Sequence, residues 1–265
     1  MTVAVAGLAS TAMTLLASCD AAPSGGTFHS QLPPLPANTR RIYLVRHGQT
    51  DWNAAGKMQG GGFDIPLNDM GKRQAAAAAE CLAGVPLDVV ASSSLARAHA
   101  TAEAIFKKHP TAARVSDARF AEMRFGGFEG MVVKGKGADA VVTRAFAKVK
   151  QQQAADPGVQ WPAVVEGLGR GGDEGLSAGE STHDVALRTR EGLESLMTST
   201  GSDASHVCIV AHGRVNRVLL ASLLTRTEDD IEQGNTCINV LDWDERQGTW
   251  SEILINYEGH TSGLQ

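Results

Sequence analysis

Two apolar runs of this 265-residue chain, 42–45 and 206–211, each lead into a histidine that is followed by a glycine. Short continuous apolar runs favour strands that are buried on both faces, as in a parallel sheet. Such strands deliver the residues that follow them to the carboxyl edge of the sheet, where ligands bind in open α/β folds. The pattern therefore predicts that His47 and His212 meet at one edge of a single sheet, with Gly48 allowing a close backbone approach to a ligand.

Further strands and helices alternate along the chain. Asn68 is a plausible N-cap for a helix over 69–82, whose alanine run has high helix propensity. A strand is predicted over 87–92, followed by a helix over 93–105 that serine residues cap. A partial 3.6-residue period predicts another helix over 138–155. This alternation indicates an α/β class with a mostly parallel sheet.

Composition limits the kind of partner. The formal net charge of −5 offers no basic footprint for nucleic acid, so an anionic ligand would need a local cluster of arginines. The four cysteines have no CxxC spacing, which suggests neither a zinc site nor a redox pair. A hydrophobic content of 43% is enough for a sizeable core. The oligomeric state stays open.

The first 38 residues have the composition of a targeting-like segment and a linker. The run 11–19 resembles the apolar core of a secretory signal, and its end at Cys19 resembles a bacterial lipobox, although no basic residue precedes Arg40. Membrane association is expected only if Cys19 is lipidated. An organelle signal, or a disordered extension on an otherwise cytoplasmic protein, are the alternatives. Residues 21–38 are rich in proline and glycine and are interpreted as an unpacked linker.

Three motifs resemble the histidine phosphatase superfamily, in the branch that includes cofactor-dependent phosphoglycerate mutases. They are Leu-Val-Arg-His-Gly-Gln-Thr-Asp-Trp-Asn at 44–53, Ser-x-Leu-x-Arg-Ala-x-x-Thr-Ala at 93–102, and Glu-x-x-aromatic-Gly at 122–126. The resemblance implies a three-layer α/β/α sandwich with a mostly parallel central sheet over 39–258. A cap-like insertion at about 131–179 and a tail over 259–265 complete the predicted organisation.

The resemblance also implies roles for individual residues. His47 would be transiently phosphorylated, and Glu122 would act as the general acid. The residues expected to bind the phosphate or substrate are Arg46, Asn53, Gln59, Gly60, Arg97, His212 and Gly213. A plain surface loop is an equally good interpretation of Gln59, and the three consecutive glycines leave the register at Gly60 open.

The chemistry of these residue types agrees with that assignment. Two arginines match phosphate oxygens with paired hydrogen bonds and disfavour a protonated imidazole at His47, which leaves a neutral nucleophile. Its other ring nitrogen is expected to donate to a backbone carbonyl near Gly48. Glu122 would protonate the leaving oxygen. No metal and no cofactor is required, because the arginines would repel a dication.

Three functions are compatible with this site. The first is a phosphatase that hydrolyses phosphomonoesters of small metabolites through phosphohistidine. The others are a phosphoglycerate-mutase-type phosphotransferase and a catalytically silent module that binds a phosphorylated ligand. The segment Glu-Met-Arg-Phe-Gly departs from the mutase pattern Glu-Arg-His-Tyr-Gly, and the glycine-rich run 167–175 suggests a mobile cap. Both features favour the phosphatase. Arg217 is predicted to form an ion pair, and Lys134, Lys136 and Arg170 are predicted to be solvated surface charges.

Overall fold

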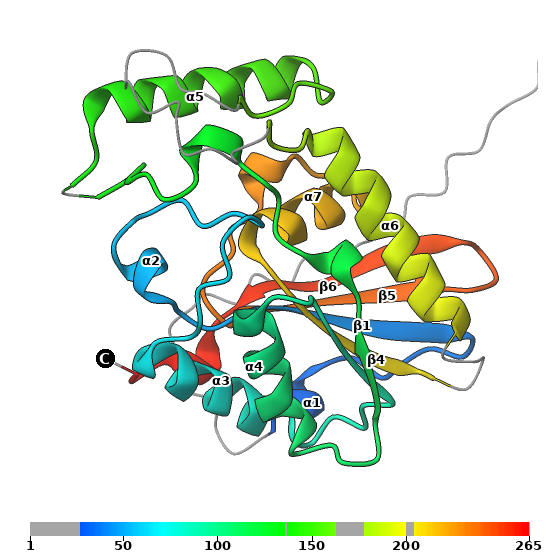
Figure 1. The fold of residues 1–265 in the computed structure, drawn as a ribbon. Coiled ribbons are helices and arrows are strands. Elements are labelled where there is room, and N and C mark those ends of the chain that lie inside the picture. Colours follow the sequence, from blue (N-terminus) through cyan, green and yellow to red (C-terminus); the bar gives the residue numbers. More distant parts are fainter. Residues whose placement is uncertain (1–26, 136, 163–177, 200–203, 265) are drawn as a thin grey trace, which may run out of the picture.

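The computed structural model describes residues 27–135, 137–162, 178–199 and 204–264. Within these residues one sheet of six strands has the order β3-β2-β4-β1-β5-β6 (Figure 1). The strands are β1 (Thr39–Arg46), β2 (Val89–Ser92), β3 (Ala113–Ser116), β4 (His206–Ala211), β5 (Ile238–Asp244) and β6 (Thr249–Tyr257). Strands β1 to β4 are mutually parallel, whereas β5 runs antiparallel to β1 and β6 antiparallel to β5. The predicted mostly parallel sheet is confirmed.

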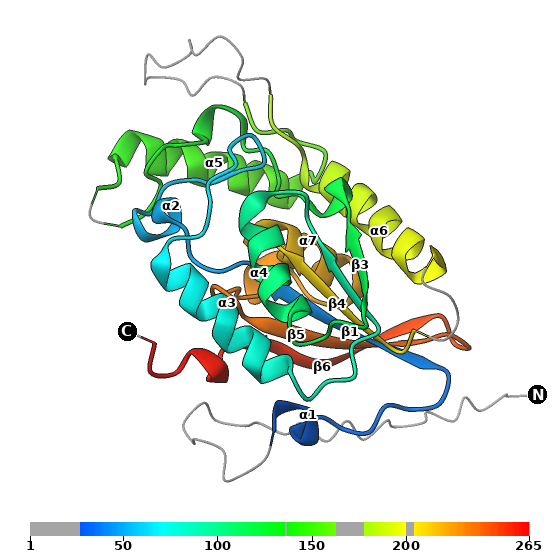
Figure 2. The same ribbon diagram turned by 60° about the horizontal axis from the view of Figure 1, so that its bottom comes forward.

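Helices cover both faces of the sheet, which confirms the three-layer arrangement (Figures 1 and 2). The α-helices are α1 (Phe28–Gln31), α2 (Asp51–Ala54), α3 (Asp69–Leu82), α4 (Ala96–Phe106), α5 (Ala140–Ala155), α6 (Thr182–Ser199) and α7 (Gly213–Leu223). The 3-10 turns are η1 (Ala118–Phe120), η2 (Gly126–Phe128), η3 (Glu228–Asp230) and η4 (Gly259–Thr261).

Strand β1 is buried on both faces because its side chains enter two different cores. Ile42 and Leu44 pack in the core shared with α6 and α7, while Tyr43 and Val45 pack in the core shared with α1, α3 and α4. This explains why the strand reads as a continuous apolar run rather than an alternating one.

The predicted helix over 69–82 is confirmed as α3. Its predicted N-cap is confirmed as well, since Asn68 Oδ1 accepts a hydrogen bond from the backbone N–H of Gly71 at 2.8 Å. The predicted serine cap of the next helix is wrong. Helix α4 begins after Leu95, which makes no side-chain cap. The Ser93 hydroxyl instead accepts from the backbone N–H of Leu95 and contacts the ring of His212.

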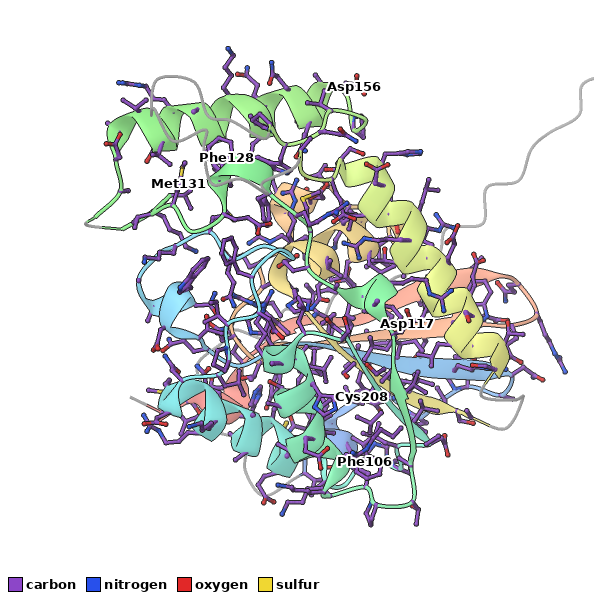
Figure 3. All side chains as sticks on the ribbon, in the orientation of Figure 1. Phe106, Asp117, Phe128, Met131, Asp156 and Cys208 are labelled. Atoms are coloured by element: carbon purple, nitrogen blue, oxygen red, sulfur yellow. The ribbon has the colours of Figure 1, made fainter. Side chains whose placement is uncertain are left out.

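Helix α5 lies apart from the sheet, above the part of the chain that follows η2 (Figure 1). Phe128 and Met131 lie beneath it, on the side that faces the rest of the domain (Figure 3). This helix confirms the helical period predicted over 138–155. The glycine-rich run 167–175 with Arg170, and also Lys136, lie outside the described residues, so the extent of the cap-like insertion stays a prediction.

The predicted unpacked linker is wrong at Phe28 and Pro33, whereas residues 34–38 are mostly exposed. Phe28 is buried against the ring of Tyr257, with ring centroids 4.9 Å apart, and Arg41 Nη1 donates to the Pro33 carbonyl at 2.8 Å. Within the predicted tail, Gly259–Thr261 form η4, and His260 contacts the Thr236 hydroxyl at 3.2 Å. The targeting-like segment, including Cys19, lies outside the described residues. Among the described helices, none is long and apolar enough to span a membrane.

Candidate active site

The two histidines that follow β1 and β4 lie together. These strands are neighbours in the sheet, with Arg46 paired to Ala211 at their carboxyl ends. Each strand continues directly from this pair into its histidine. The rings of His47 and His212 therefore lie side by side, with centroids 5.1 Å apart. The predicted meeting of the two imidazoles at one sheet edge is confirmed in geometry, while their chemical roles stay predictions.

His47 is held as a neutral ring with one free nitrogen. Its Nδ1 donates to the Gly48 carbonyl at 2.6 Å, the contact predicted from the sequence, so that Nε2 is the nitrogen without a proton. The ring is 3% exposed. Burial first, and then the charges of Arg46 and Arg97, hold the pKa of His47 well below its usual range. A buried neutral imidazole with an available lone pair is a nucleophile at neutral pH.

Arg97 is fully buried, and it connects His212 to the glycine loop. Its guanidinium donates to the carbonyls of Gly60 at 3.2 Å and Phe63 at 3.0 Å, and through Nε to His212. These contacts use three of its five N–H groups. Burial lowers the pKa of Arg97 to about 10, which still keeps it charged at neutral pH.

Both ring nitrogens of His212 are used within the protein. Nδ1 accepts from Arg97 at 3.2 Å, and Nε2 contacts the Ser93 hydroxyl at 2.8 Å. His212 therefore reaches a phosphate only by exchanging one of these partners. Burial, followed by the charge of Arg97, lowers the pKa of His212 well below its usual range.

Glu122 connects the loop after η1 to the start of α7. Its carboxylate accepts backbone N–H groups from Met123 at 2.9 Å, Val215 at 3.1 Å and Arg214 at 3.2 Å. Two of these donors belong to the first turn of α7, directly after His212. The positive end of that helix thus fixes the carboxylate beside the second histidine.

His47 and Glu122 line a cavity of about 340 Å³. Its described lining contains six cationic side chains and one carboxylate, that of Glu122; the cations are Arg46, Lys57, Lys134, Lys150, Arg214 and Arg217. Arg46 donates through Nη1 to the Gln233 carbonyl at 2.7 Å, while its buried Nε has no partner among the described residues. A cavity with this charge balance favours an anionic ligand.

The other predicted phosphate-binding residues divide into two groups. Asn53, Gln59 and Gly213 line the cavity together with His47 and Arg46. Gly60, Arg97 and His212 do not appear in that lining and stand behind it. Gln59 also has a structural contact, because its Oε1 accepts from the Thr50 hydroxyl at 2.6 Å.

The absence of a side chain at Gly60 has a clear structural reason. A Cβ atom there would collide with the carboxylate of Glu129. That carboxylate accepts from the backbone N–H groups of Phe125 at 2.8 Å and Gly62 at 3.1 Å, so it ties the glycine loop to the segment that carries Glu122. Glu129 is therefore structural.

Several cavity residues were not predicted from the sequence. Arg217 forms no ion pair within the described part of the chain and lines the cavity, so the predicted ion pair is wrong. The helical spacing from Gly213 to Arg217 was the available signal, since residues four apart share a helix face. Lys134 is exposed, as predicted, and it also lines the cavity. Asn235 donates to the backbone carbonyl of His47 at 3.2 Å, which no local pattern indicated.

No group of three or more His, Cys, Asp or Glu side chains placed to hold a metal ion occurs within the described ranges. A buried neutral imidazole, clustered guanidinium groups and a nearby carboxylate at the carboxyl ends of parallel strands are groups that phosphoryl transfer can use. The family model described as histidine phosphatase superfamily (branch 1) matches residues 42–256, and the chain belongs to this family. The predicted superfamily is thereby confirmed.

Individual relatives include phosphatases and mutases. The chain is 34% identical over 230 residues to a glucosyl-3-phosphoglycerate phosphatase of Mycolicibacterium vanbaalenii, covering 84% of this chain and 85% of the relative. It is 27% identical to a 2,3-bisphosphoglycerate-dependent phosphoglycerate mutase 2 of Gloeobacter violaceus, covering 81% and 90%. A solved structure of mycobacterial glucosyl-3-phosphoglycerate phosphatase complexed with VO3 gives a TM-score of 0.65 at 28% identity, covering 83% of this chain and 100% of that one.

Proposed function

We propose that this protein is a phosphatase that hydrolyses a phosphomonoester of a small carboxylated metabolite through a phosphohistidine at His47. The single observation that carries this proposal is the orientation of His47, whose Nδ1 is fixed by Gly48 while the ring lines a cationic cavity. The relatives with the higher identities are named as phosphatases, which agrees with the class predicted from the sequence.

The reaction has two chemical steps. His47 Nε2 attacks phosphorus, the bond to the leaving oxygen breaks, and Glu122 supplies the proton that this oxygen needs. In the second step Glu122 takes a proton from water, whose oxygen attacks phosphohistidine and releases inorganic phosphate. Arg46, which lines the cavity, stabilises the charge of the phosphoryl oxygens in both transition states, and the positive charge of Arg97 behind the lining adds to this effect.

Positive charge in the cavity, beyond that of Arg46, supports a second anionic group on the substrate. Lys134 and Arg217 line the cavity, and neither forms an ion pair with a carboxylate in the described ranges. Burial lowers the pKa of Lys134, and the neighbouring charges of Arg46 and Arg217 lower it further. Like charges held close together are unfavourable, and an anion that binds between them relieves this repulsion. Because Arg46 belongs to the phosphate site, we assign Lys134 and Arg217 to a carboxylate of the leaving group.

A mutase is the second candidate, because one of the relatives is a bisphosphoglycerate-dependent mutase. The two candidates differ in the fate of the phosphoryl group. A phosphatase passes it to water, whereas a mutase returns it to the product and requires a bisphosphate primer.

A phosphate-release assay separates these functions. We expect rapid release from glucosyl-3-phosphoglycerate or 3-phosphoglycerate without any primer. The result that would reject the phosphatase is negligible release together with interconversion of phosphoglycerates that depends on added 2,3-bisphosphoglycerate. Hydrolysis restricted to phosphoesters without a carboxylate would reject the assigned substrate class alone.

We further propose that residues 39–258 form the catalytic domain and that part of the region 131–179 acts as its cap. One observation supports this division. Lys134, Phe146 and Lys150 come from that region and line the same cavity as His47. The role of residues 1–38 in targeting stays a proposal based on their composition alone.

A further inference from the structure

One wall of the active-site cavity is aromatic, and the proposed chemistry makes no use of it. The lining includes three apolar aromatic side chains besides its cationic residues, namely Phe125, Phe146 and Trp161. We call these three side chains the aromatic wall. A phosphoryl group and a carboxylate are both anionic and strongly hydrated, so neither gains from contact with this surface.

The wall has a fixed base. Trp161 is fully buried, its Nε1 donates to the sulfur of Met123 at 3.2 Å, and its ring meets the ring of Phe125 edge-on at a centroid distance of 5.1 Å. The backbone of Trp161 is also held in place, since Gly179 N donates to the Trp161 carbonyl at 2.7 Å. A side chain at Gly179 would collide with Trp161. Two of the three departures from the mutase motif therefore serve the wall: Met123 supports Trp161, and Phe125 is part of it.

Helix α5 completes the wall. The ring of Phe146 stacks on that of Trp161 with centroids 4.9 Å apart and an interplanar angle of 26°, and its edge meets Phe128 at 5.5 Å. Phe146 stays partly exposed and lines the cavity, as does Lys150 four residues later on the same helix face. Lys150 is held by Asp229 at 2.8 Å, which ties α5 to η3.

We propose that Phe146 is a specificity-determining residue that packs against the nonpolar face of a ring in the leaving group, such as a sugar. The C–H face of a sugar ring is apolar, and covering it with an aromatic surface removes that area from water. The inference rests on the proposed function, in which Lys134 and Arg217 hold a carboxylate. It adds that the preferred substrate carries a ring as well as that carboxylate.

Two substrates that differ only in the ring test this proposal, namely glucosyl-3-phosphoglycerate and 3-phosphoglycerate. In the Phe146→Ala variant we expect kcat/KM for the glucosylated substrate to fall about tenfold, mostly through KM, because the lost contact is uniform binding. For 3-phosphoglycerate we expect a change within about twofold. Phe146→Tyr keeps the ring and should restore the preference, whereas Phe146→Leu fills the space beside Phe128 and should not.

Val141→Ala is the matched control, since Val141 is an exposed apolar residue of α5 outside the cavity lining. It should leave both substrates unchanged. An equal fall for both substrates in Phe146→Ala and Phe146→Leu, or no fall for either, would overturn the role of Phe146. That failure is distinct from failure of the proposed function, which would appear in the wild-type protein as no phosphate release from either substrate and would overturn both.

Discussion

Arg97 donates from its Nε to Nδ1 of His212 across 3.2 Å. A guanidinium has only donors, so Nδ1 of His212 is the acceptor and the ring proton lies on Nε2, facing the Ser93 hydroxyl. Protonation of His212 would place two N–H groups against each other. The native site is therefore built around two neutral imidazoles, since His47 is also held neutral by burial and by the same arginine.

Stability should fall as the solution becomes acidic below about pH 6.5, where histidines of the unfolded chain take up protons. Above that pH both imidazoles are neutral in the folded and the unfolded state, so they contribute no pH dependence. Below that pH the histidines of the unfolded chain bind protons, whereas His47 and His212 of the folded protein stay neutral because folding lowers their pKa values. Between about pH 7.5 and pH 5.5, each histidine should lower the free energy of unfolding by about 1.4 kcal/mol.

Urea unfolding of the wild type and His47→Gln at these two pH values measures the effect. The difference between the two pH values should shrink in the variant by the contribution of one histidine. An unchanged difference would mean that the folded protein accepts a proton on His47 as readily as the unfolded chain does.

Glu122→Gln should slow turnover by about a hundredfold or more for substrates with poor leaving groups, because the proton donor is lost. For p-nitrophenyl phosphate, whose leaving group needs no proton, the first step should slow by less than about tenfold. A stopped-flow measurement of p-nitrophenol release isolates that step. Equal losses for both kinds of substrate would show that Glu122 only supports the N-terminus of α7.

Lys134→Met and Arg217→Met should each raise KM for 3-phosphoglycerate about tenfold, equivalent to about 1.4 kcal/mol of binding. KM for p-nitrophenyl phosphate, which has no carboxylate, should stay within about twofold. Lys148→Met is the control, because Lys148 is exposed on α5 and does not line the cavity. Equal effects on the two substrates would assign these cations to the phosphate rather than to a second group.

Phe28→Ala should destabilise the fold by about 3 kcal/mol, the usual cost of removing a buried phenyl ring. The ring is 6% exposed and packs against Tyr257 near the other end of the chain. Chemical denaturation measures the loss, with Leu187→Ala, an exposed apolar residue of α6, as the control. A loss below about 0.5 kcal/mol would return residues 27–38 to the status of an unpacked linker.

Local signals in the sequence predicted the scaffold well. The helix from Asp69 to Leu82 was found with both ends because its N-cap and its alanine run are local features. The strands that carry His47 and His212 were found because a buried parallel strand needs a continuous apolar run.

Long-range contacts could not be predicted in the same way. Phe28 stands in a proline-rich segment, and only the slot beside Tyr257 makes it a core residue. Arg217 was assigned an ion pair although the acid nearby, Glu228, is taken by Arg214 at 3.0 Å. Helix α5 was predicted, but its place over the cavity depends on the contact of Phe146 with Trp161, which lies beyond the helix end.

The central claim is that His47 carries the phosphoryl group, and rapid quench in alkali tests it most directly. Wild-type protein mixed with ³²P-labelled substrate should hold acid-labile, alkali-stable label, and peptide mapping should place that label on His47. The His47→Ala variant should hold none, while His212→Ala should still accept some. Label that persists in His47→Ala, or its absence from a wild type that is turning over, would contradict the account.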